Sequence, residues 1–348
     1  MPLFQGKPSR ALVAVTAILF LTVAGCGSEA GKDSATVDRP EPVVEDTPAP
    51  QQTHAWPLTG VSVDDGEFGP ALSVKIENSP AARPQGGLER ADIVWEQLVE
   101  GGMTRFVAMF HSDLPETLWP IRSVRPMDAA IAGMVGGGLA FSGGQAEYQA
   151  KIAATGVTLI SHDGGNAGFY RDPNRQGDHR LFGKTEQLLA QVGEPESPPE
   201  LFSYADEGED PAAVRSGSEA NAVETRFPAS KPSWQWNGEV WQRLESGQPA
   251  HAESGTRLEA ANVVAIRVEV RDTGNRDAAG SMVPETVLTG SGEAAVFSDG
   301  HMIEGTWEKD SDTDPLRLVG ADGEELTLAP GKTWVELVPN QGGSVQVS

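Results

Sequence analysis

The chain contains a single cysteine, Cys26, among its 348 residues. One thiol cannot form an intramolecular disulfide, and it leaves no second cysteine for a thiolate-ligated zinc site. Because Cys26 ends an N-terminal apolar run, it also supplies no thiolate nucleophile to the rest of the chain. The remainder must therefore be stabilised by packed apolar cores, and the roughly 290 residues after a tether are enough for one or two.

The first 25 residues have the order of a secretory signal. Two basic residues precede an apolar run over 11–24, which is shorter than the ~20 residues that a membrane-spanning helix needs. The run ends at Val23-Ala24-Gly25-Cys26, which resembles the bacterial lipobox, where cleavage leaves an acylated cysteine as the first residue. A plain signal with a cysteine there by chance is the alternative. We predict a lipoprotein signal at 1–25 and a lipid anchor on Cys26.

Composition and pattern divide the rest of the chain. Residues 26–55 are rich in proline and acidic residues, which predicts a disordered tether. Strand patterns alternate with short helical patterns over 56–193, which predicts an α/β domain. Prolines and an acidic run over 194–224 indicate a linker or long surface loop. Strand patterns dominate 225–348. The expected fold class is therefore α+β, with an N-terminal α/β domain followed by a mostly antiparallel β C-terminal domain.

The charge of the chain excludes one class of partner. The formal net charge is −24, and removal of a signal containing Lys7 and Arg10 makes it more negative. The field of such a protein repels nucleic acid and other bulk polyanions, so we predict no nucleic-acid partner. Familiar catalytic signatures are absent from the sequence, including the Gly-x-Ser-x-Gly elbow, the His-Glu-x-x-His pair and the phosphate-binding P-loop. We assign no cofactor.

Ordered motifs run through the chain, from Arg83-Pro-Gln-Gly-Gly-Leu88 and Glu100-Gly-Gly-Met-Thr-Arg-Phe106 to Pro330-Gly-Lys-Thr-Trp334. Together with Pro120-Ile-Arg-Ser-Val-Arg125 they resemble a bacterial lipoprotein family with YerB-like members, over about residues 56–340. The resemblance implies an envelope lipoprotein of two parts and brings no established reaction. Family members usually have Arg-Ser-Ala-Arg and a Gly-Gly-Ser element, whereas this chain has Arg-Ser-Val-Arg and Ser142-Gly-Gly-Gln145.

Three arginines are the strongest candidates for ligand binding: Arg105, Arg122 and Arg125. The last two are three residues apart, at the start of a helix expected over 126–135. Arginine forks beside a helix N-terminus favour an anion site for a carboxylate or phosphate. The alternative is that these arginines neutralise Glu96, Glu100 and Asp128 in a buried network that organises the domain.

The same three carboxylates are the candidates if the protein is an enzyme. Glu96 and Glu100 would lie about 13 Å apart along a strand at ~3.3 Å per residue. A glycosidase pair needs roughly 5 to 9.5 Å, so this pair fails on a strand, although Asp128 could partner one of them through the fold. We therefore assign no catalytic residue and lean towards a protein that is not an enzyme.

A polar loop follows the strand expected at 157–160. His162 and Asp163 lie at the position where α/β proteins place binding groups. With Asp172 and His179 they could bind a divalent cation or position a ligand. Aspartate is also an ordinary turn residue, and no spacing here matches a metal motif. We therefore assign these four residues to ligand binding and assign no metal.

These features together predict a lipid-anchored accessory protein on the outer face of the cytoplasmic membrane. It would contact the membrane through the lipid on Cys26 and bind peptidoglycan or another wall component, a wall precursor, or an envelope protein such as a wall-synthesis enzyme. The alternative function is a hydrolase or transferase of wall glycan or peptide that uses paired carboxylates.

Overall fold

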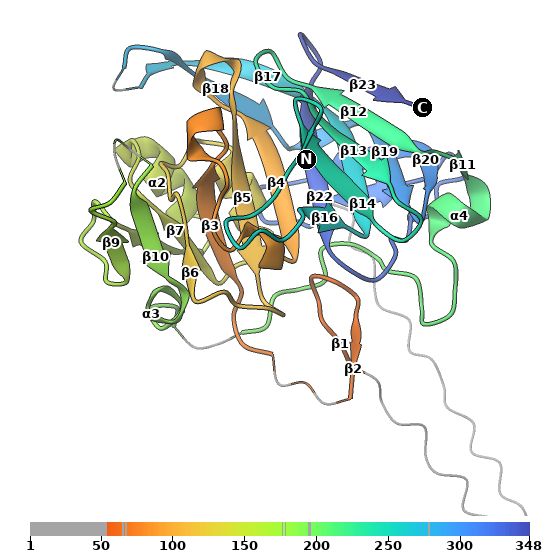
Figure 1. Ribbon diagram of the computed structural model, residues 1–348, viewed down its shortest axis with the longest axis horizontal. Helices are drawn as coiled ribbons and strands as arrows, with labels where there is room; N and C mark the ends of the chain where they lie inside the picture. Colours follow the sequence, from red (N-terminus) through yellow and green to blue (C-terminus); the bar gives the residue numbers. More distant parts are fainter. Residues whose placement is uncertain are drawn as a thin grey trace, which may run out of the picture. The chain divides into compact units, whose positions relative to one another are not determined.

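One large sheet passes through both halves of the chain (Figure 1). The computed structural model describes residues 54–348 except 65, 67, 176, 178, 194, 195 and 278, so Cys26, the predicted signal and nearly all of the predicted tether lie outside the described residues. Within the described chain the sheet has twelve strands. Ten follow the order β11 (Ser218–Glu219), β20 (His301–Lys309), β19 (Gly290–Ser298), β17 (Asn262–Arg276), β22 (Thr333–Pro339), β4 (Ile93–Leu98), β5 (Thr104–Phe110), β3 (Leu72–Glu77), β7 (Gly138–Phe141) and β8 (Thr158–Ser161), while β18 (Met282–Val287) pairs with β17 and β21 (Arg317–Val319) pairs with β20.

Strand β22 joins the two halves. It pairs in parallel with β17 on one side and with β4 on the other, so that Thr333 aligns with both Asn262 and Ile93. Strands β4, β5 and β3 continue as antiparallel neighbours, and β3, β7 and β8 are parallel. The N-terminal and C-terminal strands therefore share one hydrogen-bonded ladder.

Both faces of this sheet are buried at β4 and β22. Successive side chains of a strand point to opposite faces, and in β4 Ile93 and Trp95 belong to one core cluster while Val94 belongs to another. Strand β22 repeats the pattern, with Val335 in the first cluster and Trp334 in the second. An apolar run without alternation is typical of a strand that is covered on both sides.

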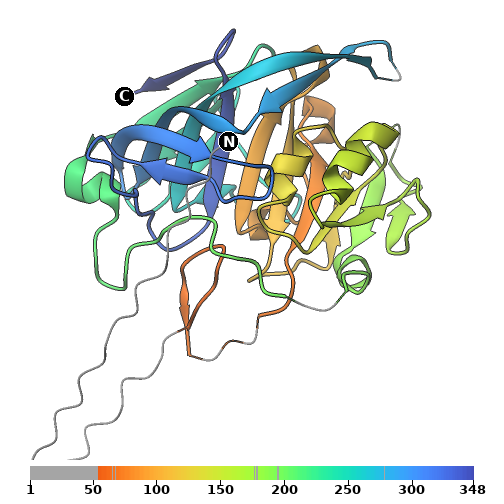
Figure 2. The ribbon, with the colours of Figure 1, turned by 180° about the vertical axis from the view of Figure 1, so that it is seen from behind.

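The expected α+β fold with an N-terminal α/β domain is wrong, because the structure is mostly β. The described residues form four short α-helices: α1 (Asp128–Ala132), α2 (Ala146–Ala153), α3 (Thr185–Leu189) and α4 (Ala212–Ser216). Three 3₁₀ turns add Pro80–Ala82, Leu88–Arg90 and Glu100–Gly102. The helix expected over 126–135 spans only Asp128–Ala132, since a glycine-rich stretch leads directly into β7. Figure 2 shows the yellow helices of this region in front of the orange strands.

A second sheet packs on the large one. It has six strands within the described chain, in the order β15 (Gln248–Pro249), β14 (Trp241–Glu245), β13 (Pro232–Trp236), β12 (Ala222–Arg226) and β23 (Ser344–Val347), with β16 (Glu259–Ala260) on β14. Trp234 and Trp241 share a core cluster with Trp334 of the large sheet. Asn237 and Gly238 form the turn between β13 and β14, since asparagine and glycine tolerate the conformation that such a turn requires.

Smaller elements complete the described residues. Strands β6 (Thr117–Leu118), β10 (Leu181–Lys184) and β9 (Phe169–Arg171) form a three-stranded sheet, and β1 (His54–Ala55) pairs with β2 (Ser62–Val63). The stretch expected as a linker or long loop carries α4 and buries Leu201 and Phe202. No helix in the described part is long and apolar enough to cross a membrane.

Candidate functional site

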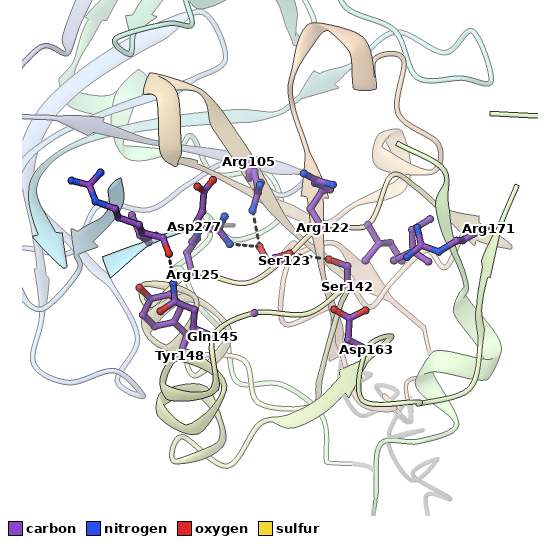
Figure 3. A pocket seen from close by; sticks show the side chains of 15 residues that line it. Arg105, Arg122, Ser123, Arg125, Ser142, Gln145, Tyr148, Asp163, Arg171 and Asp277 are labelled. Carbon is purple, nitrogen blue, oxygen red and sulfur yellow. Dashed lines mark hydrogen bonds between the residues drawn. The ribbon is translucent and has the colours of Figure 1, made fainter. Parts of the chain in front are cut away.

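A pocket opens where β3, β7 and β8 end (Figure 3). The segment 120–125 runs past these strand ends and is hydrogen-bonded to them. The Arg122 backbone N–H donates to the Lys75 oxygen at 2.9 Å, and the Ser142 N–H donates to the Arg122 oxygen at 3.0 Å. Residues that follow different strands are thereby brought to one place. Carboxyl ends of parallel strands are a common position for binding sites.

The pocket has a volume of about 670 Å³ and a lining rich in arginine. The structure brings Arg105, Arg122 and Arg125 together there and adds two arginines that the sequence did not single out, Arg171 and Arg276. The other lining residues are Ile121, Ser123, Ser142, Gly144, Gln145, Tyr148, Asp163, Leu181, Asp277 and Val283.

Carboxylates compensate the charges of two of these arginines. Arg125 donates to both oxygens of Glu100, with 2.8 Å between Nη2 and Oε2. The Nε of Arg122 lies 3.0 Å from Oε2 of Glu77. Part of the cluster is therefore a structural ion-pair network, as the alternative interpretation of these residues holds, but its acids are Glu77 and Glu100.

Arg105 differs from these two. Its side chain is 8% exposed, and it donates from Nη1 to the Ser123 backbone oxygen at 3.0 Å. No carboxylate of the described residues forms an ion pair with it. Burial, followed by the neighbouring Arg125 and Arg122, lowers the pKa of Arg105 to about 10, so the guanidinium remains charged at neutral pH. A buried cation without a counter-charge is unfavourable until an anion binds beside it.

The helix that faces the pocket is α2. The five-residue α1 is not available, because Oδ2 of Asp128 already accepts the Arg125 N–H at 2.6 Å. No side chain caps the N-terminus of α2, and Gly144 and Gln145 before it line the pocket. Its first N–H groups have no intrahelical acceptor and carry a partial positive charge.

Two features of the Ser142-Gly-Gly-Gln145 segment shape this part of the site. A Cβ on Gly143 would lie 2.1 Å from Oδ2 of Asp163, so glycine allows that carboxylate to sit against the backbone. Tyr148 is 4% exposed, and its hydroxyl is buried without a hydrogen-bond partner among the described residues. An unsatisfied buried hydroxyl is costly, and this one belongs to a side chain that lines the pocket.

The C-terminal half completes the pocket through the hairpin of β17 and β18. This hairpin extends beyond the sheet towards α2 (Figures 1 and 2). Gln145 donates to the Arg276 backbone oxygen at 3.0 Å, Asn275 donates to Glu147, and Lys151 pairs with Glu285 at 2.8 Å. The pocket is thus formed by both halves of the chain.

Two of the carboxylates considered for catalysis are buried and already accept hydrogen bonds from neighbouring side chains. Asp128 accepts from Lys75 at 2.7 Å and from Gln97 at 2.6 Å, and burial lowers the pKa of Lys75 to about 8. Glu96 accepts from Thr104 at 2.6 Å and pairs with Arg243 at 2.5 Å. Neither carboxylate lines the pocket, so neither is placed to act on a ligand there.

Glu96 belongs to a network that sequence reasoning missed. Arg243 is fully buried and pairs with Glu96, Glu336 and Glu245, and its guanidinium lies 4.5 Å above the ring of Trp334. Burial acts to lower the pKa of Arg243, but the three carboxylates raise it above its usual value. Burial and the Glu96 carboxylate raise the pKa of Glu336. The network fastens the six-stranded sheet to β4 and β22.

The four polar loop candidates lie in different places. Asp163 lines the pocket, and its Oδ1 is 2.9 Å from Nδ1 of His162. His179 lies 2.9 Å from Glu77, the carboxylate that also pairs with Arg122. Asp172 accepts the Asn174 N–H in the turn after β9. No group of three or more acidic, histidine or cysteine side chains in the described chain is placed to hold a metal ion.

Two family models match the chain, one after the other. The model for the N-terminal domain of the DUF3048 proteins, a family of unknown function, matches residues 58–197. The model for their C-terminal domain matches residues 223–335. Together the two matches cover most of the described residues, and the chain belongs to this family.

A relative and a solved structure agree with this assignment. Putative lipoprotein YerB of Bacillus subtilis (strain 168) is 28% identical over 309 residues, which cover 82% of this chain and 86% of that protein. The crystal structure of the YerB protein from Bacillus subtilis matches with a TM-score of 0.70 at 22% identity, over 84% of this chain and 99% of that one. The resemblance inferred from the motifs is confirmed, and the fold is shared. Neither name states a ligand or reaction.

Proposed function

We propose that this protein is a lipid-anchored accessory protein of the bacterial cell envelope, and that its arginine-lined pocket binds an anionic ligand. The ligand would be a wall component, a wall precursor or an acidic segment of a wall-synthesis enzyme. The lipobox at Cys26 supports the anchor on the outer face of the cytoplasmic membrane, and the name of the Bacillus relative agrees with it.

The observation that carries the proposal is the state of Arg105. A structural arginine in a protein interior normally has a carboxylate beside it, as Arg125 and Arg243 do here. Arg105 lines the pocket and has only a backbone oxygen as a hydrogen-bond acceptor in the described chain. The missing counter-charge is what an anionic ligand would supply.

The alternative function, cutting or transfer of wall glycan or peptide, has less support. It requires carboxylates that a substrate can reach, and Glu96 and Asp128 are fully buried. Both carboxylate oxygens of Glu100 accept hydrogen bonds from Arg125. No observation on the described residues favours catalysis over binding.

Co-sedimentation with purified peptidoglycan sacculi tests wall binding. The mature chain from residue 26, with Cys26→Ser to remove the lipid, is compared with the same chain carrying Arg105→Gln. Arg317→Gln serves as the control, because Arg317 is exposed and lies outside the pocket. We expect the parent and the control to pellet and the Arg105 variant to stay in solution. Equal pelleting of all three would refute a role for the pocket, and fragments released into the supernatant would favour the enzyme.

Lipid attachment is tested separately. Cells expressing the full chain are fed a labelled fatty acid, and the protein is recovered with its membrane fraction. We expect label in the wild type and none in Cys26→Ala. Label that persists in the variant would contradict anchoring through Cys26.

A further inference from the structure

We infer that the anionic group bound in this pocket is a phosphate, presented as a phosphate ester or a diphosphate, and that Tyr148 donates a hydrogen bond to it. The inference rests on the proposed function and narrows its ligand class. It is drawn from three properties of the pocket: the directions from which donors reach it, the number of arginines without a counter-charge, and the unsatisfied tyrosine hydroxyl.

Hydrogen-bond donors reach the pocket from several elements. Arg105 belongs to β5, and the hydroxyls of Ser123 and Ser142 lie 3.1 Å apart on different segments (Figure 3). The uncapped N-terminus of α2 adds backbone N–H groups. A carboxylate offers two oxygens in one plane, whereas a phosphate ester offers three strong acceptor oxygens in a tetrahedral arrangement. Donors that converge from different directions match the phosphate.

The charge balance of the pocket calls for an anion. Within the described chain no carboxylate forms an ion pair with Arg105, Arg171 or Arg276, although all three line the pocket. The two aspartates of the lining each have one carboxylate oxygen in contact with another group. Oδ1 of Asp163 contacts His162, and Oδ1 of Asp277 accepts two backbone N–H groups of its own turn. Both aspartates keep their negative charges, so the three arginines leave a small excess of positive charge, which a phosphate ester with about −1.5 to −2 charges at neutral pH would compensate.

Tyr148 gives the inference a specific donor. Its side chain is buried and lines the pocket, and its hydroxyl has no partner in the described chain. A structural tyrosine in an interior normally satisfies its hydroxyl. Tyr148 lies on the first turn of α2, beside the uncapped N–H groups. A phosphate at this end of the helix would satisfy the hydroxyl and the helix N-terminus together.

Isothermal titration calorimetry on the mature chain carrying Cys26→Ser tests the ligand class. The probes are pyrophosphate, glycerol phosphate, acetate and succinate at one ionic strength, because binding of charges is salt-dependent. We expect both phosphates to bind at least tenfold more tightly than succinate, which carries two carboxylates. Vesicles with and without phosphatidylglycerol then distinguish a lipid headgroup from a soluble phosphate ester as the source. Equal affinity for succinate and pyrophosphate would overturn the inference.

Three variants test the residues. Tyr148→Phe removes only the hydroxyl and should lower phosphate affinity about fivefold, the size of one hydrogen bond. Tyr170→Phe is the matched control, because Tyr170 lies outside the pocket and should leave the affinity unchanged. Arg171→Gln changes an exposed residue and should weaken binding without affecting the fold. Unchanged affinity in Tyr148→Phe would refute the assignment of the tyrosine.

The two proposals fail in different ways. If wild type pellets with sacculi through Arg105 but binds no phosphate probe, the phosphate inference is wrong and the proposed function stands. If wild type neither pellets with sacculi nor binds any of the four probes, the proposed function and the inference fail together.

Discussion

Arg243→Met should cause a large loss of stability through the loss of charge pairing, because the side-chain volume changes little. Arg243 has no exposed surface, and its nitrogens lie 2.5 Å from Glu96, 2.9 Å from Glu336 and 2.7 Å from Glu245. Methionine fills much of the same space, so the cavity left behind is small. The substitution removes the cation that pairs with Glu96 and Glu336, whereas Glu245 keeps a second partner, Arg83, at 2.9 Å.

The magnitude follows from the burial of the acids. Glu96 and Glu336 are fully buried, and removal of one partner from a buried ion pair costs about 3–5 kcal/mol because the remaining charge is uncompensated. The whole free energy of unfolding of a typical domain is about 5–15 kcal/mol. At roughly 2 °C per kcal/mol for a chain of this size, the melting temperature should fall by about 6–10 °C.

Tryptophan fluorescence during urea and thermal unfolding measures the effect, since Trp234 and Trp334 both lie beside Arg243. The triple variant that adds Glu96→Gln and Glu336→Gln removes the uncompensated charges and should recover part of the loss. Arg317→Met, on the surface, is the control and should change stability by less than about 0.5 kcal/mol. A loss below about 1 kcal/mol in Arg243→Met would refute the view that this network holds the two sheets together.

Three further outcomes are expected. The folded-state pKa of Glu336 is raised, so the folded protein binds this proton more tightly, and the resulting stabilisation decreases as the pH rises above about 4.5. The stability of Glu336→Gln relative to wild type should therefore increase between pH 4.5 and 8. A difference in urea midpoints that stays constant over this range would contradict the prediction. Gly137→Ala should lower the free energy of unfolding by about 1 kcal/mol or more beyond the loss in Gly136→Ala, as measured by chemical unfolding. Both glycines have positive φ, but only at Gly137 would a Cβ meet a backbone oxygen, that of Ala71 at 2.2 Å. Equal losses in the two variants would exclude the clash. Glu100→Gln should weaken the ion pair with Arg125, lower stability and raise the affinity for pyrophosphate, and calorimetry that finds lower affinity would show that Glu100 positions the arginine for binding.

Local sequence patterns located the N-terminal strands of the large sheet. The run 72–77 alternates and is β3, and the turn after Leu98 separates β4 from β5. The architecture was not predictable, because pairing of β22 with β4 joins residues about 240 positions apart. Hydrophobic periodicity reports which faces of a strand are buried and not which strand lies beside it. The α/β expectation failed because short helical patterns between glycines do not have the length to cover a sheet.

The candidate site was predictable only in part. Arg122 and Arg125 are close in sequence to a helical pattern, and that pattern pointed to them. Arg276 belongs to a hairpin of the C-terminal half, and nothing in the sequence around it indicates a binding site. Tyr148 sits within an ordinary helical pattern, and only the absence of a partner for its hydroxyl distinguishes it. The burial of Glu96 was not predictable either, because the cation that compensates its charge, Arg243, belongs to a different sheet.

The position of β22 sets the timing of folding. A chain made or threaded from its N-terminus presents β4 long before residues 333–339 exist to pair with it, so one edge of the N-terminal strands stays open during that interval. The C-terminal strands meet the same delay, because β17 needs the same partner. Neither half reaches its final sheet until almost the last residue has arrived. Pairing over such sequence distances is slow, and a chain cut short before residue 333 would leave two unfinished edges that favour aggregation.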